Sequence, residues 1–350
     1  MRRHIPNLDG LRAFAILPVL GQHASYGLIG GGFLGVDLFF VLSGFLITGI
    51  LFDELQNAHA IGYRNFYVRR ALRLLPAMVI SLLLAAALWP LTFSEGNHFA
   101  LAATSVVFYF SNFVNPGALG SLESAWSLSL EEQFYLIWPL ALALLFAQRK
   151  ANVRQMMWLL VTVVALVAIG RIVALATFAS PEWVYRFTLT RADSLIMGAL
   201  AALFVRDGFQ FKPAFRQIVV MISGVLFFCG VIWCSWQSPI MGNGGFTFST
   251  FVFAAWIIAL TQSPPLRPFS NRIFKWIGHR SYGLYIYHLP IFLALEHLRA
   301  HDDLANFLWV SLLRFGLTFL VADLSYRYIE QPVLKLKRLF PTLEKGQGRG

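Results

Sequence analysis

Charged side chains are scarce in this sequence of 350 residues. Asp, Glu, Lys and Arg make up only 13% of it, whereas 57% of it is apolar. A soluble globular domain carries roughly a quarter charged residues, so most of the surface of this protein must face something other than water. The deficit excludes an ordinary soluble domain and predicts an all-α protein embedded in a lipid bilayer.

Cysteine is also nearly absent. Cys229 and Cys234 are the two cysteines, and both lie in one apolar run, which predicts packing residues and argues against a disulfide framework or a metal cluster. The formal net charge of +11 is scattered between long apolar segments and forms no basic face. This distribution argues against a nucleic-acid partner, and we expect the lipid bilayer to be the main surrounding.

Long apolar runs predict about ten transmembrane helices, because about 17 to 25 apolar residues suffice to cross a bilayer. The expected spans cover residues 9–28, 33–52, 74–93, 130–147, 157–178, 191–205, 217–236, 245–263, 281–298 and 304–326. A further apolar stretch, residues 99–113, is expected to be re-entrant or interfacial. No internal repeat is evident, so we expect one membrane domain, residues 1–332, and a short basic tail, residues 333–350.

Basic residues predict the orientation of the spans, since Lys and Arg are in excess in cytoplasmic loops. With ten spans and an inner N-terminus, most of the 28 Lys and Arg residues fall on the cytoplasmic side. A crossing by residues 99–113 would move the basic loop at residues 148–150 outside. Both termini are therefore expected in the cytoplasm. Asp9 and Arg12 interrupt the first apolar run, so no cleavable signal peptide is expected.

Ionisable residues inside spans are costly and tend to mark a pathway or a site. Arg12 and His23 are eleven residues apart in the first span, so they project from nearly the same helix face, about 16 Å apart. A guanidinium can hold a phosphate while an imidazole handles a proton some distance away. In the alternative interpretation, Arg12 extends to the inner headgroups and His23 is a structural histidine.

The second span opens with GGFLGVDLFFVLSGFLI, residues 31–47. Asp37 in this segment is expected about as deep from the outer face as His23, where it could orient the imidazole as the carboxylate does in a hydrolase triad. The glycines of the segment could equally serve close helix packing, which is the commoner role of small residues in membranes.

An arginine cluster stands at the inner end of the third span, in FYVRRALRLLP, residues 66–76. Arg70 and Arg73 share a helix face because they are three residues apart. Together with Arg69 they suit multidentate phosphate binding. The alternative is an ordinary positive anchor at the membrane surface.

Two carboxylates open the fourth span, in AWSLSLEEQFYLIWPL, residues 125–140. Glu131 or Glu132 could serve as a base partner or bind substrate hydroxyls, or both could simply be solvated. Weaker candidates of the same kind occur in TRADSLIMG and SYGLYIYHLP, and they are Arg191, Asp193, Ser194, Tyr282, Tyr285 and His288. A lone histidine such as His288 is more often structural.

Taken together, these motifs resemble the acyltransferase 3 family of bacterial membrane O-acyltransferases. The resemblance rests on NLDGLRAFAIL with Arg12 and His23, GVDLFFVLSGFLI, FYVRRALRLLP, WSLSLEEQFYL and SYGLYIYHLP, from about residue 7 to residue 332. It implies a bundle of ten spans in the bacterial inner membrane, with residues 1–332 as the acyltransferase domain. Some members carry a hydrolase-like domain after the membrane part, and we expect the stand-alone form here.

The resemblance further implies transfer of an acyl group, usually acetyl, from cytoplasmic acyl-coenzyme A to a hydroxyl of a carbohydrate outside the cytoplasm. Acceptors in the family include lipopolysaccharide, exopolysaccharides, peptidoglycan and some small molecules. Arg12, Arg69, Arg70 and Arg73 match the family's arginine motifs, and we expect them to bind the donor. We expect His23 to act as general base or to form a transient acyl-histidine, with Asp37 or Glu132 as the orienting carboxylate. No metal is expected.

Two other functions remain open at this point. A proton-coupled transporter or exporter would also use ionisable residues within its spans, although no paired Gly/Pro-broken segments are evident in the two halves. A structural or assembly partner would explain the apolar bulk of the chain but not the charges inside its spans. The acceptor sugar, the acyl chain length and the oligomeric state do not follow from the sequence.

Overall fold

The structure is a computed structural model that describes residues 5–25, 29–147, 152–177, 180–299 and 303–343. Within these ranges the chain forms helices and connecting loops, without any β-strand. The basic residues Arg2, Arg3, Arg149, Lys150, Lys345 and Arg349, which the charge argument assigns to the cytoplasmic side, lie outside these ranges.

Ten long helices form the body of the described part of the chain. They are α1 (Pro6–Ala24), α2 (Phe33–Ala58), α3 (Tyr63–Thr92), α6 (Trp126–Ala147), α7 (Val153–Thr177), α9 (Thr188–Arg206), α10 (Pro213–Trp233), α11 (Phe246–Thr261), α13 (Arg272–Ala294) and α14 (Leu304–Ser325). The shorter elements are α4 (Phe99–Val107), η1 (Ser111–Phe113), α5 (Pro116–Leu119), η2 (Gly120–Ala125), α8 (Pro181–Arg186), η3 (Met241–Gly245), α12 (Arg267–Ser270), η4 (Glu296–Leu298), η5 (Tyr326–Glu330), α15 (Gln331–Lys335) and η6 (Leu336–Leu339).

Eight helical segments among the described residues are long and apolar enough to cross a membrane. The protein is therefore an all-α membrane protein. Helices α1 and α13 are not among the eight, although their 19 and 23 residues span about 28 and 34 Å. They pack against each other, so the predicted total of ten spans stays a prediction.

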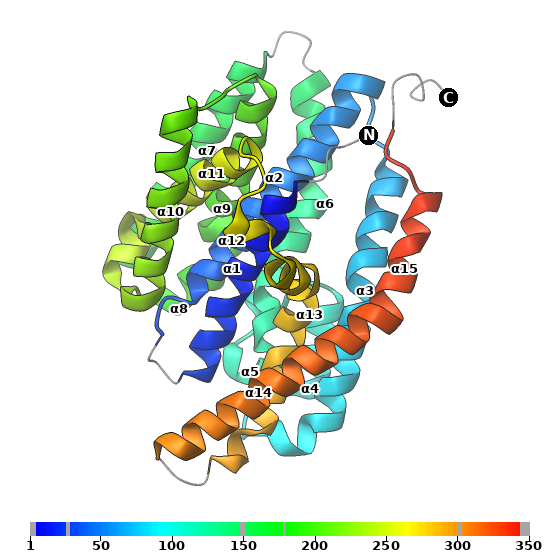
Figure 1. Ribbon diagram of the computed structural model, residues 1–350, viewed down its shortest axis with the longest axis vertical. Coiled ribbons are helices and arrows are strands. Elements are labelled where there is room, and N and C mark those ends of the chain that lie inside the picture. Colours follow the sequence, from blue (N-terminus) through cyan, green and yellow to red (C-terminus); the bar gives the residue numbers. More distant parts are fainter. Residues whose placement is uncertain (1–4, 26–28, 148–151, 178–179, 300–302, 344–350) are drawn as a thin grey trace.

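The apolar segment at residues 99–113 does not form a long helix. It folds into α4, which has nine residues, followed by the single turn η1. Nine residues rise about 14 Å, which is about half the hydrocarbon thickness. In Figure 1, α4 and α5 lie at the lower end of the bundle, beneath α3 and α6. This placement agrees with a segment that does not cross the membrane.

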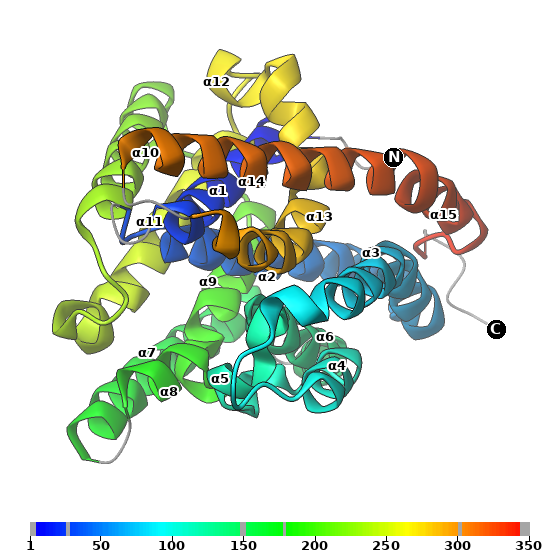
Figure 2. The same ribbon diagram turned by 90° about the horizontal axis from the view of Figure 1, so that it is seen from below.

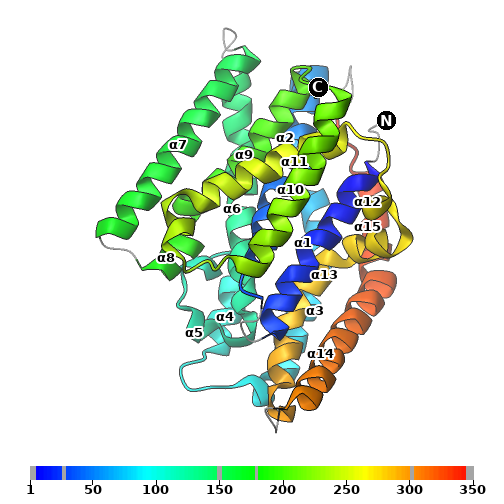
Figure 3. The same cartoon turned by 60° about the vertical axis from the view of Figure 1, so that its left-hand side comes forward.

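The helices alternate between two ends of the bundle. In Figure 1 the turn from α2 to α3 lies at the upper end, and the turn from α13 to α14 lies at the lower end. Seen from below, α14 and α15 run along one side of the molecule, with α12 beyond them, and α7 and α8 lie toward the opposite side (Figure 2). Figure 3 shows α7 on one flank and α14 on the other. Helices α1, α2, α9 and α13 lie between these flanks.

The contact between α2 and α9 forms the centre of the bundle. Of 18 consecutive, predominantly apolar residues in each segment, 78% are buried in α2 and 72% in the span formed by α8 and α9, compared with 17% in α10. Glycines allow the two backbones to approach: a Cβ at Gly44 would lie 1.9 Å from the Leu195 carbonyl oxygen, and one at Gly198 would lie 2.0 Å from that of Val41. The packing role that the sequence left open for Gly44 is therefore confirmed.

Two buried ion pairs connect α2, α7, α9 and α11 in the same region. Asp37 on α2 pairs with Arg191 on α9, and all four side chains of the two pairs have 0% exposure. Arg171 on α7 lies 3.0 Å from Asp193 on α9. The Thr247 hydroxyl on α11 donates to Asp193 at 2.7 Å and lies 2.5 Å from the Arg171 guanidinium. These charges hold helices together at a distance from solvent.

Gly44 offers a direct test of the central packing. We expect Gly44→Ala to lower stability by about 1–3 kcal/mol, because its methyl group would collide with the α9 backbone. Gly316→Ala on α14 is the matched control, since a Cβ there meets nothing within 4 Å. The melting temperature of purified protein in detergent measures both variants. Equal stability of the two variants would contradict the assignment.

The Asp37–Arg191 pair can be tested by exchange for apolar residues. We expect Asp37→Leu alone to cost about 3–5 kcal/mol, because it leaves a buried guanidinium without its carboxylate. Asp37→Leu combined with Arg191→Met should recover most of the loss. Folded yield and melting temperature are the measurements. If the double variant is stable but inactive, Asp37 or Arg191 has a chemical role beyond the ion pair.

Candidate active site

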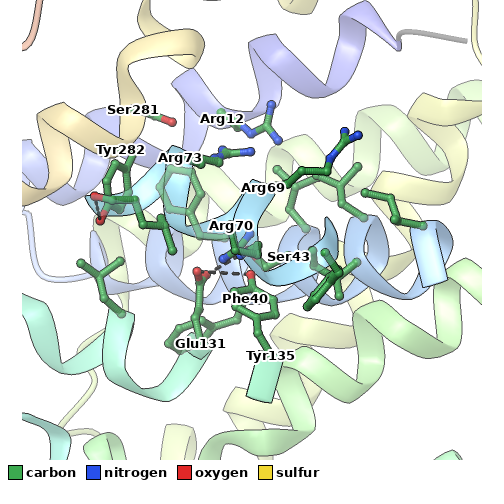
Figure 4. Close-up of a pocket in the computed structure, with 18 of the residues that line it drawn as sticks. Arg12, Phe40, Ser43, Arg69, Arg70, Arg73, Glu131, Tyr135, Ser281 and Tyr282 are labelled. Atoms are coloured by element: carbon green, nitrogen blue, oxygen red, sulfur yellow. Dashed lines mark hydrogen bonds between the residues drawn. The ribbon is translucent and has the colours of Figure 1, made fainter. Parts of the chain in front are cut away.

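A cavity of about 330 Å³ opens among α1, α2, α3, α6 and α13. This volume lies at the lower end of the range for small-molecule sites. Arginines of two helices line it: Arg12 comes from α1, and Arg69, Arg70 and Arg73 come from α3. In Figure 4 Arg12 and Arg73 lie side by side, with Arg70 below them. Arg69 lies nearer the start of α3. All four residues predicted to bind the donor thus line one cavity.

The helix positions of these arginines follow from their spacing. Residues 69, 70 and 73 fall within about one turn of α3, so their side chains share one side of that helix. Arg12 lies about two turns from the start of α1. Helix α13 packs against both α1 and α3. Two separate sequence motifs therefore meet at the cavity.

Carboxylates balance only part of this positive charge. Arg70 donates to Glu132 Oε1 at 2.8 Å, and its guanidinium lies 3.7 Å from the centre of the Tyr135 ring. Arg12 pairs with Asp9 at 3.1 Å. Arg73 has no ion pair or hydrogen bond among the described residues. The cavity therefore keeps unbalanced positive charge, which favours an anionic ligand.

The two glutamates on α6 lie on the arginine side of the site. Glu131 accepts a hydrogen bond from the Ser43 hydroxyl at 3.0 Å, and the Tyr135 hydroxyl lies 3.4 Å from it. Glu132 pairs with Arg70, and the structure shows no contact between it and His23 within the described ranges. The expectation that Glu132 orients the imidazole therefore finds no support in the geometry.

His23 lies near the other end of α1 and is exposed. Its Nδ1 is 2.9 Å from the Val19 carbonyl oxygen. Because a carbonyl oxygen only accepts hydrogen bonds, Nδ1 must carry the proton, which leaves Nε2 of the neutral ring with a lone pair. A backbone group thus fixes the tautomer that a general base requires, without a carboxylate.

Asp37 does not take the position that was expected beside His23. Asp37 was expected near His23 because the two residues have about equal depth in neighbouring helices. A helix turns by about 100° per residue, however, so the Asp37 side chain points about 200° around α2 from the direction of Gly35. Gly35 faces α1, where a Cβ would lie 2.0 Å from the Ala15 carbonyl oxygen. Asp37 therefore faces α9 and pairs with Arg191. The structure shows no contact between Asp37 and the His23 imidazole among the described residues.

A second histidine lies next to His23. The His288 ring centre on α13 is 4.8 Å from that of His23, and His288 has 0% exposure. Its Nδ1 lies 2.6 Å from the Tyr285 carbonyl oxygen, so its Nε2 also has a lone pair, and this atom has no partner among the described residues. The sequence made His288 only a weaker candidate, of a kind that is more often structural, whereas the structure places it beside His23.

Tyr285 connects the two parts of the site. Its side chain lines the arginine cavity, and its ring centre is 5.7 Å from that of His288. The Tyr285 hydroxyl donates to the Ser124 carbonyl oxygen at 3.0 Å and lies 2.7 Å from the Ser127 hydroxyl. His23 itself does not line the cavity. Tyr285 and His288 therefore stand between the arginines and His23.

Other candidates from the sequence fall into two places. Tyr282 lines the arginine cavity, whereas Arg191 and Asp193 belong to the buried ion pairs of α9. Sequence reasoning missed Ser43, Tyr135 and Lys337, which also line the cavity. Ser43 and Tyr135 lie within motifs that were singled out, but Lys337 lies beyond them and carries no signal of its own.

Comparisons with known proteins agree with this arrangement. A family model described as an acyltransferase domain matches residues 5–327. The putative peptidoglycan O-acetyltransferase YrhL of Bacillus subtilis is 34% identical over 95% of this chain, and the peptidoglycan O-acetyltransferase OatA of Listeria monocytogenes is 31% identical over 95%. The O-acetyltransferase OatA of Staphylococcus aureus is 32% identical over 99%.

The chain spans 55 to 60% of the length of these relatives. No solved structure matches it significantly. The family match nevertheless covers most of the chain and includes every motif described above. The chain therefore belongs to the acyltransferase 3 family.

Proposed function

We propose that this protein is a membrane O-acyltransferase that moves an acetyl group from acetyl-coenzyme A to a hydroxyl of a cell-envelope glycan. The observation that carries the proposal is the arrangement along α1. Arg12 lines a cavity with three further arginines, and His23, three turns away, presents a basic Nε2. One helix thus joins an anion site to a candidate general base.

The donor fits the charge of the cavity. Coenzyme A carries a diphosphate and a 3′-phosphate, and clustered guanidinium groups suit multidentate phosphate binding. The eleven residues between Arg12 and His23 correspond to about 16 Å of helix, a distance that the pantetheine arm can bridge. The arm would pass Tyr285 and His288 to bring its thioester to His23.

The proposed chemistry requires one base and one leaving group. His23 Nε2 accepts the proton of the acceptor hydroxyl while that oxygen attacks the thioester carbonyl carbon. The new C–O bond forms, the C–S bond breaks, and the coenzyme A thiolate leaves and is then protonated. Proton removal by a positioned imidazole contributes roughly 10²- to 10⁴-fold in rate. An acyl-histidine intermediate is the alternative route to the same products.

The acceptor and the membrane are proposed from the relatives and the charge pattern. Two relatives are named for peptidoglycan O-acetylation, and we take a peptidoglycan-type glycan as the acceptor class. We place the protein in the bacterial cytoplasmic membrane with both termini in the cytoplasm, in accordance with the positive-inside rule. Residues 1–332 would then be the acyltransferase domain, with the arginine cavity open to the cytoplasm.

Replacement of His23 tests the general base. We expect His23→Ala to lower the rate of acetyl transfer by at least about 100-fold, because the proton acceptor is lost. His297→Ala is the matched control, since His297 is also exposed and its Nδ1 lies 2.8 Å from a backbone carbonyl oxygen. Transfer of label from acetyl-coenzyme A to peptidoglycan fragments by purified protein is the measurement. Equal rates for both variants would exclude His23 as the base.

Replacement of Arg73 tests the donor site. We expect Arg73→Gln to raise KM for acetyl-coenzyme A about tenfold with a smaller effect on kcat, because a charge-assisted phosphate contact is lost. Arg64→Gln, an exposed position on the same helix, should behave as wild type.

Vesicles that contain the wild-type protein separate an enzyme from a transporter. Solute movement by wild-type vesicles without consumption of acetyl-coenzyme A would contradict the proposed reaction.

A further inference from the structure

The residues that follow α15 cover part of the arginine cavity. Lys337 and Thr342 line this cavity together with the arginines of α1 and α3. The Asn65 amide donates to the Pro341 carbonyl oxygen at 2.9 Å, and the Arg69 guanidinium donates to that of Phe340 at 3.2 Å. Residues 336–343, which the sequence analysis assigned to a basic tail, are therefore one wall of the cavity.

Lys337 adds a positive charge where other cations already gather. The guanidinium groups of Arg73 and Arg69 exert the strongest charge repulsion on its ammonium group. Arg70 and Arg12 have carboxylate partners, whereas Arg69, Arg73 and Lys337 form no ion pair with any described carboxylate. Glu54 and Glu131 also line the cavity, but neither forms an ion pair with these three cations. The mutual repulsion of the cations therefore favours an anion that binds between them.

The position of Lys337 indicates which part of the donor it meets. Helix α3 starts at Tyr63, and its first turn holds the 336–343 segment through Asn65. Arg69 lies about 6 Å further along the helix from Asn65, and Arg73 about 6 Å beyond Arg69, beside Arg12 (Figure 4). The 336–343 segment thus covers the end of the cavity away from His23, where the adenosine end of the donor would lie once its thioester reaches His23.

Resting on the proposed function, we propose that Lys337 binds the 3′-phosphate of the coenzyme A donor together with Arg69, and that residues 336–343 are part of the donor site. Arg73 and Arg12 remain for the diphosphate. A segment outside the ten long helices thereby contributes to the choice of donor, because the 3′-phosphate distinguishes coenzyme A from its 3′-dephospho form.

Kinetics with two donors test this assignment on the purified full chain. Wild-type protein should have a lower KM for acetyl-coenzyme A than for 3′-dephospho-acetyl-coenzyme A. We expect Lys337→Gln to raise KM for acetyl-coenzyme A about tenfold and to change KM for the dephospho donor by less than about twofold. Lys337→Arg should keep most of the preference. Lys335→Gln, at an exposed lysine at the end of α15, is the control and should behave as wild type.

Each outcome decides a different point. A wild type that transfers no acetyl group from acetyl-coenzyme A would overturn the proposed function and this inference with it. An active wild type whose Lys337→Gln variant loses affinity equally for both donors, or for neither, would overturn the 3′-phosphate assignment alone. Lys337→Met, which keeps the apolar stem, repeats the test if the Gln variant is unstable, and it is expected to lose the donor preference in the same way.

Discussion

Hydrocarbon offers an ionised side chain neither water nor counter-ions, so each charge inside this bundle needs a partner within the protein. Asp37 with Arg191 and Arg171 with Asp193 meet this constraint as ion pairs, and they lie on the helices that form the centre. Arg70 meets it with Glu132. Arg69, Arg73 and Lys337, which form no ion pair with a described carboxylate, line one cavity. The same constraint therefore explains both the rigid centre and the place where a charged ligand fits.

The sequence predicted the helices well where apolar length alone determines them. The span expected at residues 33–52 corresponds to α2, and residues 99–113 form only a short helix and a turn. Helix starts were predicted less well. Helix α3 begins at Tyr63, eleven residues before the expected span, because its first turns are helical but polar and leave no apolar signal. The short 3₁₀ and π helices η1 to η6, including η5 at the end of α14, also have no apolar run that would have predicted them.

The site shows a different limit of sequence reasoning. Residues on one helix could be related to each other, as with Arg69, Arg70 and Arg73, because the helical repeat fixes their angles. Residues on different helices could not, because the rotation of each helix about its own axis depends on packing. The glycines of α2 determine that rotation, and they turn Asp37 toward α9 and away from His23. Lys337 was missed for a related reason, since nothing local shows that its segment folds back onto α3.

The carbonyl group that orients His23 belongs to the main chain of Val19. Side-chain replacement at position 19 leaves this oxygen in place, so an alanine scan of the protein would not reveal it. The same geometry is available to any histidine that follows a helical residue by four positions. A proton-accepting imidazole can therefore arise in a transmembrane helix by a single substitution, without a second acidic residue at matching depth.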